Sequence, residues 1–318
     1  MTTPYVATGP EDLIALAPTV LRFDPDNSVV VMTFGRPGGS FHARVDLPRS
    51  AQEQEEVADT ILHAMKQNHL RVCAVLLYSE DRKVATAQAR RLDDCLTAGG
   101  IRVVDVLLVT GHRYFRVLQG DYEGTVFDLE AHPFTARRVL DGVIVHKSRD
   151  DLAGTLRPSK AAAEAFDDVR NEVARWRNRS DPVADGSWLQ AGVPQMLLGG
   201  PVSDTELARI LAALLDPALL DVVWAMIDIG GASAHVDLWR GVVRRSPEDL
   251  VAAPACLLAF ASWLSGDGAL AWCGLDRCVD PTLPMARMLS ELLQSAVPPR
   301  LWPGLSAEQL SSLRGPAA

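Results

Sequence analysis

The residues best suited to chemistry follow apolar segments that are predicted to be buried strands. Residues 79–82 (Ser-Glu-Asp-Arg) come directly after the run 72–78, and residues 110–113 (Thr-Gly-His-Arg) follow the run 103–109. In open α/β sheets, ligands bind outside the carboxyl ends of parallel strands. We therefore expect one ligand-binding edge, and its candidate residues are Glu80, Asp81, Arg82, His112 and Arg113.

Two carboxylates, two guanidiniums and one imidazole could bind an anionic ligand such as a nucleotide. They could also supply acid and base groups, because a histidine titrates near neutral pH. The simpler interpretation is that both segments are ordinary solvated loops, since loops on protein surfaces are polar in any case. The residue types favour this simpler interpretation and leave the ligand site open as an alternative.

A second candidate group is expected at the opposite edge, where the segment before the first strand meets the end of the second. It consists of Arg22, Asp24, Asp26 and Asp46. Three carboxylates could hold a divalent cation through their oxygen atoms. Asp24-Pro-Asp-Asn-Ser28 is also good turn chemistry, and Asp46 can pair with Arg22 or Arg44. We favour the turn and the ion pair, and predict no metal site.

Motifs of common enzymes are missing. Residues 35–40 (Gly-Arg-Pro-Gly-Gly-Ser) are rich in glycine but lack the Gly-Lys-Ser/Thr ending of a phosphate loop, so we predict a hairpin loop. Neither Gly-x-Ser-x-Gly nor His-Glu-x-x-His occurs. Residues 265–269 (Ser-Gly-Asp-Gly-Ala) are predicted to form a tight corner between two helices, in which Gly266 ends one helix and Asp267 caps the next. The sequence names no catalytic residue and no cofactor, and leans towards a protein that is not an enzyme.

The elements that must position these residues alternate in the first half of the chain. Patterns of apolar residues predict a helix, two strands, a helix, a strand, a helix and two strands, with a further strand candidate at 142–146. Pro18 is expected to end or kink the first helix. This order predicts an α/β fold with a mixed, mostly parallel sheet flanked by helices.

From about Arg149 onward the pattern changes to successive helices, which predicts an all-helical C-terminal region. We therefore expect an α/β domain over residues 1–148 and a helical domain over 149–318, with an irregular linker at about 178–186. The seven tryptophans fall almost entirely in the second half and are expected to anchor a core or an interface.

Composition excludes several classes of protein. The 318 residues carry a net charge of −9, which argues against a nucleic-acid-binding surface and against docking on anionic membranes. The five cysteines are sparse and form no C-x-x-C pair, and the N-terminus lacks a basic and apolar leader. We expect a reduced, soluble, cytoplasmic protein.

Four short motifs resemble a family of actinobacteria and their phages that is known as a domain of unknown function. They are Leu-Arg-Phe-Asp-Pro-Asp-Asn-Ser at 21–28, Arg-Val-Asp-Leu-Pro at 44–48, Ser-Arg-Asp-Asp-Leu at 148–152 and Trp-Leu-Ser-Gly-Asp-Gly-Ala at 263–269. Arg22 stands where the family usually has glycine. The cysteines that the family often carries after its third strand are absent from the segment beginning at His112. The resemblance implies a phylogenetic setting and no activity.

Three functions remain open at this point. The leading hypothesis is a non-catalytic scaffold that binds a protein partner or itself, because catalytic motifs are missing and the helical half is rich in tryptophan. The second is an enzyme or sensor that binds an anionic small molecule or nucleotide at the carboxyl edge of the sheet. The third, a nucleic-acid factor, is disfavoured by the acidity of the chain.

Overall fold

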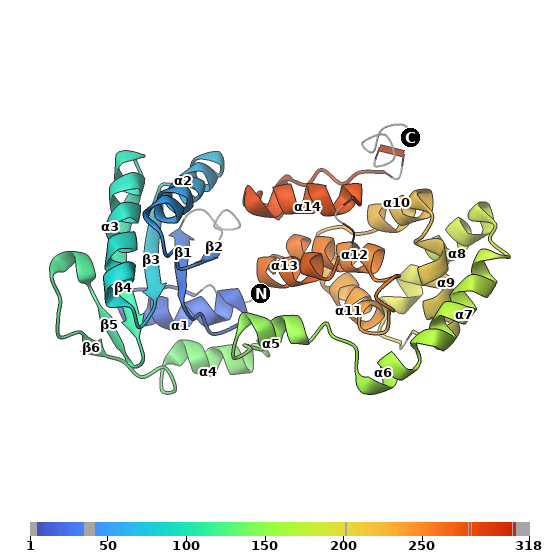
Figure 1. The fold of residues 1–318 in the computed structure, drawn as a ribbon, viewed down its shortest axis with the longest axis horizontal. Coiled ribbons are helices and arrows are strands. Elements are labelled where there is room, and N and C mark those ends of the chain that lie inside the picture. The colour runs from blue at the N-terminus through green and yellow to red at the C-terminus, as the bar shows by residue number, and fades with distance from the viewer. Residues whose placement is uncertain are drawn as a thin grey trace. The chain divides into compact units, whose positions relative to one another are not determined.

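A computed structural model describes residues 5–34, 42–200, 202–278, 280, 282–306 and 308–309. The predicted hairpin loop at 35–40 lies outside the described residues. The chain divides into two compact units, one formed by residues 1–152 with 295–298 and the other by residues 153–294 with 299–318. Each unit is described by itself below, and Figure 1 labels their helices and strands.

The first unit is an α/β unit whose elements follow the predicted order. Its helices and strands are α1 (Pro10–Leu21), β1 (Ser28–Phe34), β2 (His42–Asp46), α2 (Ala51–Gln67), β3 (Val72–Tyr78), α3 (Arg82–Ala98), β4 (Arg102–Thr110), β5 (Arg113–Phe115), a 3-10 turn (Val117–Gln119), β6 (Thr125–Val126) and α4 (Pro133–Leu140). The six strands form one sheet in the order β2-β1-β3-β4-β5-β6. Helix α5 (Arg149–Gly154) crosses the division between the units.

The prediction of a mostly parallel sheet is wrong. Among the strand pairings of the described residues, only β3 with β4 is parallel, and the other four are antiparallel. The helical crossovers through α2 and α3 do return the chain in the same direction, so β2, β3 and β4 run alike. However, β1 lies between β2 and β3 and pairs antiparallel with both. The element order is the same for either arrangement, so the order alone does not determine the sheet.

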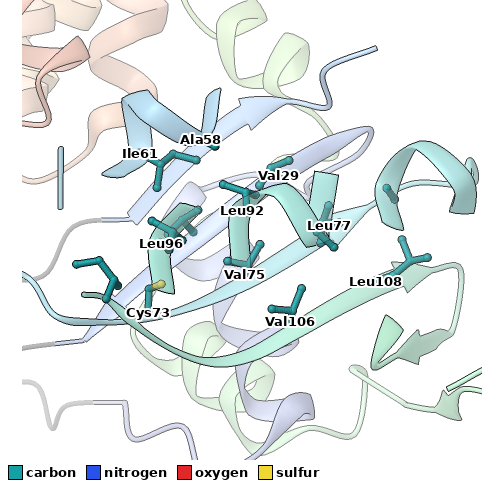
Figure 2. Close-up of a cluster of buried hydrophobic side chains, with 14 of the residues drawn as sticks. Val29, Ala58, Ile61, Cys73, Val75, Leu77, Leu92, Leu96, Val106 and Leu108 are labelled. Atoms are coloured by element: carbon teal, nitrogen blue, oxygen red, sulfur yellow. The ribbon is translucent and has the colours of Figure 1, made fainter. Parts of the chain in front are cut away.

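A hydrophobic core fills the space between one face of the sheet and helices α2 and α3 (Figure 2). Alternate residues of the central strands, such as Val29, Val75 and Leu108, point into it and meet Ile61 and Leu92 from the two helices. Because successive side chains of a strand point to opposite faces, Val30 and Leu76 belong to the other face, and they are buried as well. A sheet covered on both faces explains why these strands are apolar at nearly every position.

Helix α1 covers that second face. Of the two outcomes expected at Pro18, an end or a kink, the structure contradicts the end. The helix continues to Leu21, and Pro18 is buried within it. Proline has no backbone N–H, so the carbonyl of Ile14 lacks the donor that any other residue at position 18 would supply. The helix ends at Arg22, whose φ of 65° is in the left-handed region. Glycine takes this conformation without strain, whereas the Cβ atom of Arg22 makes it unfavourable here.

The candidate strand at residues 142–146 is not a strand. His146 forms only an isolated bridge with Phe23, in which Asp24 donates its N–H to the carbonyl of His146 at 2.9 Å. This contact places the segment that follows α4 beside the loop that follows α1. The apolar residues at 143–145 pair with no strand of the sheet.

The second unit is helical. It contains α6 (Lys160–Glu164), α7 (Phe166–Arg177), α8 (Pro182–Met196), α9 (Asp204–Ala213), α10 (Pro217–Ala225), α11 (Ala232–Val243), α12 (Ala252–Leu264), α13 (Gly268–Asp276), α14 (Pro284–Gln294) and a 3-10 turn (Pro299–Leu301). The segment predicted as a linker at 178–186 holds a short turn and the first residues of α8.

Helix α12 is the centre of this unit, and nearly all of its side chains are buried. It packs on α11, α13 and α14. Gly274 of α13 has no room for a side chain, because a Cβ atom there would lie 3.1 Å from the backbone nitrogen of Ala259. The predicted corner between α12 and α13 is confirmed. Gly266 has a φ of 84°, and the side chain of Asp267 accepts a hydrogen bond from the N–H of Leu270 at 2.9 Å.

Within the described residues, every helix is too short or too polar to cross a bilayer.

Candidate functional site

The two groups of polar residues that the sequence analysis separated lie at one edge of the sheet. Ser28, the first residue of β1, pairs with Tyr78, the last of β3, and also with Asp46, the last of β2. The start of β1 therefore meets the carboxyl ends of β2, β3 and β4. The expectation of two opposite edges is corrected, because the antiparallel β1 brings the loop before it to the edge where the parallel strands end.

A cavity of about 540 Å³ lies at this edge, within the first unit. Its floor is apolar and combines the sheet, α1 and the segment after β6, through Ile14, Ala15, Pro18, Tyr78, Val109 and Phe127. Its rim is ionisable and consists of Asp24, Asp26, Glu80, His112, Asp128, Glu130 and Arg138. An apolar floor with a few polar groups, at this volume, is typical of small-molecule sites.

Four of the predicted site residues line this cavity: Asp24, Asp26, Glu80 and His112. The first two come from the loop between α1 and β1, Glu80 follows β3, and His112 follows β4. The side chains of Asp24 and Glu80 have no hydrogen-bond or ion-pair partner among the described residues. The rim thus combines residues of both predicted groups, with carboxylates free to meet a ligand.

The other predicted residues have structural roles. The side chain of Asp81 caps α3 by accepting from the N–H of Val84 at 3.0 Å. The guanidinium of Arg82 lies 4.2 Å from the ring centre of Phe115, and Arg113 donates to the carbonyl of Gly124 at 3.1 Å. Arg82 also donates to the carbonyl of Asp121. Both guanidiniums that were expected to bind a ligand therefore hold the segment around residues 121–124.

The remaining two residues of the second group are also placed away from the cavity. Asp46 pairs with Arg44 at 2.6 Å, which is one of the two partners predicted for it. Arg22 forms the left-handed end of α1. Among the described residues, no group of three or more His, Cys, Asp or Glu side chains is arranged to hold a metal ion.

Three rim residues were missed by the sequence analysis: Asp128, Glu130 and Arg138. They belong to the stretch 120–149, which has weak periodicity. One signal was present, because His132-Pro133 is a good helix start. Proline suits the first helical turn, and the Nδ1 atom of His132 accepts from the N–H of Phe134 at 3.2 Å. Recognising helix α4 would have placed Arg138 on a helix beside the other rim residues.

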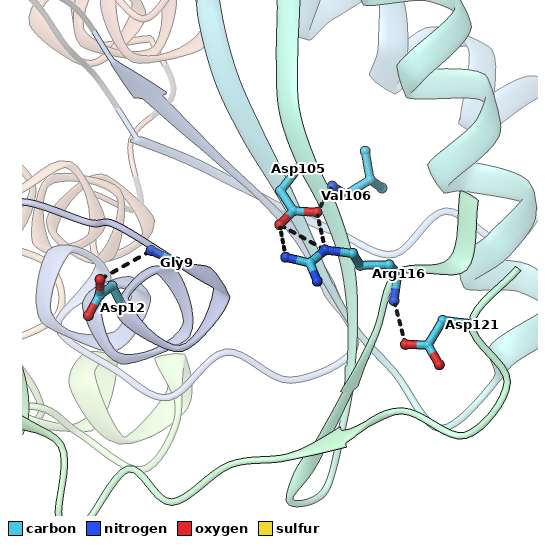
Figure 3. A network of polar contacts seen from close by, with 6 residues as sticks. All are labelled: Gly9, Asp12, Asp105, Val106, Arg116 and Asp121. Atoms are coloured by element: carbon cyan, nitrogen blue, oxygen red, sulfur yellow. Dashed lines mark hydrogen bonds and ion pairs between the residues drawn. The ribbon is translucent and has the colours of Figure 1, made fainter. Parts of the chain in front are cut away.

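A buried contact holds α4 against α1, and so shapes the cavity. The Nε2 atom of His132 lies 3.2 Å from a carboxylate oxygen of Asp12. The other carboxylate oxygen of Asp12 accepts from the N–H of Gly9 at 3.2 Å (Figure 3) and from the N–H and hydroxyl of Thr8. Burial alone would raise the pKa of Asp12, but these hydrogen bonds and His132 outweigh it and lower the pKa.

A second network holds the loop that precedes the rim residues Asp128 and Glu130. Arg116 donates to both carboxylate oxygens of Asp105, and its backbone N–H donates to Asp121 at 3.2 Å (Figure 3). Asp121 also accepts from the N–H of Gly124 at 2.9 Å. Both sides of the cavity are therefore built on hydrogen-bonded supports.

Burial affects the pKa of two polar groups of the cavity, Tyr78 in the floor and Asp24 on the rim. The hydroxyl of Tyr78 is buried and has no hydrogen-bond partner among the described residues, although buried polar groups usually have one. Burial and the nearby charge of Asp24 both raise the pKa of Tyr78. Partial burial also raises the pKa of Asp24. The charge of Arg138 lowers it, but by less.

A second, more open hollow of about 870 Å³ shares Ser79 with the cavity. Its three carboxylates already have partners within the protein. Asp81 and Glu53 cap helices α3 and α2, and Asp46 pairs with Arg44. A ligand there would have to displace these contacts, so the cavity lined by Asp24 and Glu80 is the better candidate.

The helical unit contains one reactive group that the sequence analysis left aside. A hydrogen bond with Cys256 lowers the pKa of Cys278 to about 7, and the same bond together with burial raises the pKa of Cys256. Cys256 lies on α12 and Cys278 follows α13. This pair belongs to the packing of that unit and has no part in the cavity.

Comparison with known proteins identifies the family of the chain. The family described as "Domain of unknown function (DUF4192)" matches residues 10–300, and the protein therefore belongs to it. No curated protein and no solved structure matches the chain.

Proposed function

We propose that this protein binds a small organic molecule in the cavity at the edge of the sheet. The observation that carries the proposal is the cavity itself, about 540 Å³ in volume, with an apolar floor and carboxylates on its rim that lack partners. The hydroxyl of Tyr78 in the floor is buried without a hydrogen-bond partner among the described residues, which costs free energy on folding, and a ligand that pairs with it would recover that cost.

A library of small metabolites, screened by thermal shift against the full chain, tests the proposal. A ligand that binds only the folded protein raises its melting temperature. Thr135→Trp introduces a large side chain at a residue that lines the cavity. Ala136→Trp adds the same side chain at the neighbouring exposed position of α4, and is the matched control. We expect at least one compound to stabilise the wild type and Ala136→Trp but not Thr135→Trp. A screen that finds no such compound contradicts the proposal.

A second candidate function is self-association or binding of a protein partner, as the sequence analysis expected. It is favoured by three exposed apolar side chains at the end of α4 and after it: Val139, Leu140 and Ile144, of which Leu140 is 87% exposed. Light scattering of the wild type and of Leu140→Lys tests it. A dimer that becomes a monomer on substitution supports this function, and a monomeric wild type that captures no partner argues against it.

The setting of the protein is proposed on separate grounds. The four motifs favour an actinobacterial or actinophage origin, and the five free cysteines favour a reducing compartment such as the cytoplasm. Fractionation of cells that express the native protein tests the location. Recovery outside the cytoplasm would contradict it.

A further inference from the structure

We infer that the ligand of this cavity is an organic cation, an ammonium or amidinium group carried on an apolar body. The inference rests on the proposed function and names its ligand class. It departs from the anionic ligand that the sequence alone suggested, because the guanidiniums on which that expectation depended, Arg82 and Arg113, are held by neighbouring rings and carbonyls.

The charge of the rim supports a cation. Five carboxylates line the cavity, against the single guanidinium of Arg138. Among the described residues, none of the five forms an ion pair. Arg138 opposes their charge in part, because it lowers the pKa of Asp24. A concave site lined by one sign of charge focuses its field on a ligand of the opposite sign. An anion would have to overcome that field.

The hydrogen-bonding groups of the floor also favour a cationic ligand. The carbonyl of Ile14 lacks its helical donor because residue 18 is proline, and both residues line the cavity. The residue Tyr78 is only 8% exposed, and its hydroxyl oxygen has no hydrogen-bond partner among the described residues. Carbonyl and hydroxyl oxygens accept hydrogen bonds, and an ammonium group brings three donors and no acceptor.

The rest of the floor defines the body of the ligand. Val109 and Phe127 present apolar surface from the sheet and from the segment after β6, and both are buried. A fully hydrated inorganic cation would leave this surface unused, and the described residues offer no group of ligands for a metal ion. An aromatic or aliphatic amine would cover the floor with its body and place its charge near Asp24 and Glu80.

Three probes of one skeleton test the inference: phenethylamine, 2-phenylethanol and 3-phenylpropanoate. Binding of each to the full chain is measured by NMR titration at low and at high salt. We expect the amine to bind about five- to tenfold more tightly than the alcohol, as one partly solvated charge pair allows. The carboxylate should bind most weakly, and the advantage of the amine should shrink at high salt.

Matched variants locate the effect. Asp24→Asn and Glu80→Gln should each remove most of the preference for the amine and leave the affinity for the alcohol unchanged. Neither carboxylate has a side-chain partner among the described residues, so both variants should fold, and their melting temperatures check this. Glu123→Gln removes an exposed carboxylate outside the cavity lining and should leave the preference intact.

The outcomes separate this inference from the proposed function. If the alcohol or the carboxylate binds as tightly as the amine, the cationic ligand class is overturned while the cavity remains a binding site. If none of the three probes binds, the ligand class is overturned as well. The proposed function fails with it only when the metabolite screen also finds no compound that Thr135→Trp blocks.

Discussion

The cavity rim of the α/β unit and the arginine site of the helical unit treat their charged side chains in opposite ways. In the α/β unit, Asp24 and Glu80 stand without partners around an open cavity. In the helical unit, the guanidinium of Arg209 lies between two indole rings, 4.7 Å from the ring centre of Trp176 and 4.3 Å from that of Trp188, and it pairs with Asp185 at 3.0 Å.

The aromatic residues of the helical unit are likewise packed against one another. Trp224 stacks on Trp302 with ring centres 6.3 Å apart, and Phe260 contacts both rings edge-on. These side chains fill the interior of the helical unit, as the sequence analysis expected for a core. A group whose interactions are all satisfied within the fold serves stability, whereas a group left unsatisfied at a cavity is available to a ligand. This difference supports placing the proposed binding site in the α/β unit.

The largest predicted effect is in the aromatic core of the helical unit. Phe260→Ala should lower the free energy of unfolding by about 3–5 kcal/mol, because it removes a fully buried ring and leaves a hole among two tryptophans. Urea denaturation followed by tryptophan fluorescence measures it. Leu198→Ala, at a side chain that is 82% exposed, is the control and should cost little. A loss below 1 kcal/mol for Phe260→Ala would show that these rings do not form the core.

The next effect concerns the paired charge of the helical unit. Arg209→Ala should cost about 2–4 kcal/mol, because it leaves the buried carboxylate of Asp185 without its cation and removes the contacts with both indoles. Asp24→Asn in the α/β unit is the comparison and should change stability by less than about 0.5 kcal/mol. Equal losses for the two variants, measured by chemical denaturation, would remove the contrast between the units.

A smaller effect should depend on pH and belongs to the α/β unit. Burial lowers the pKa of His42 to about 4, so His42 stays neutral in the folded protein while the unfolded chain takes up a proton near pH 6.5. The unfolded state therefore binds more protons in this window, and stability falls as the pH drops from about 6.5 to 4. The loss is on the order of 2–3 kcal/mol.

His42→Gln should flatten this part of the pH profile, as measured by urea denaturation at several pH values. His112→Gln, on the exposed rim of the cavity, is the matched control and should leave the slope in place. An unchanged profile for His42→Gln would mean that the buried imidazole is not the group responsible.

The smallest predicted effect is at the floor of the cavity. Tyr78→Phe should leave the stability of the free protein unchanged or raise it by up to about 1 kcal/mol, since the hydroxyl that it removes is buried and has no partner among the described residues. The melting temperature checks this, with Thr110→Val as the comparison, because the hydroxyl of Thr110 does donate to the carbonyl of Ser79 at 2.8 Å. A large loss for Tyr78→Phe would show that its hydroxyl is already satisfied, and would weaken the argument for a ligand there.

Local patterns predicted the elements well where one residue type dominates. The apolar run 72–78 was correctly predicted to be a buried strand, because the pattern of burial extends over a few neighbouring residues. Helix α4 was not predicted from the sequence, and the expectation that Pro18 could end the first helix was wrong. A buried proline can stay within a helix when tertiary packing outweighs the lost hydrogen bond, and no local pattern reports that packing.

The sequence by itself determined the α/β and helical elements, the corner at Gly266, and four of the residues that line the cavity. Only the tertiary structure decided that β1 runs antiparallel between β2 and β3, and this pairing brings Asp24 and Asp26 to the same edge as Glu80 and His112. It also decided that Arg82 and Arg113 serve the loop around residue 121. The physical reason is that strand pairing and the partners of a charge depend on contacts between segments distant in the chain, which local residue patterns do not encode.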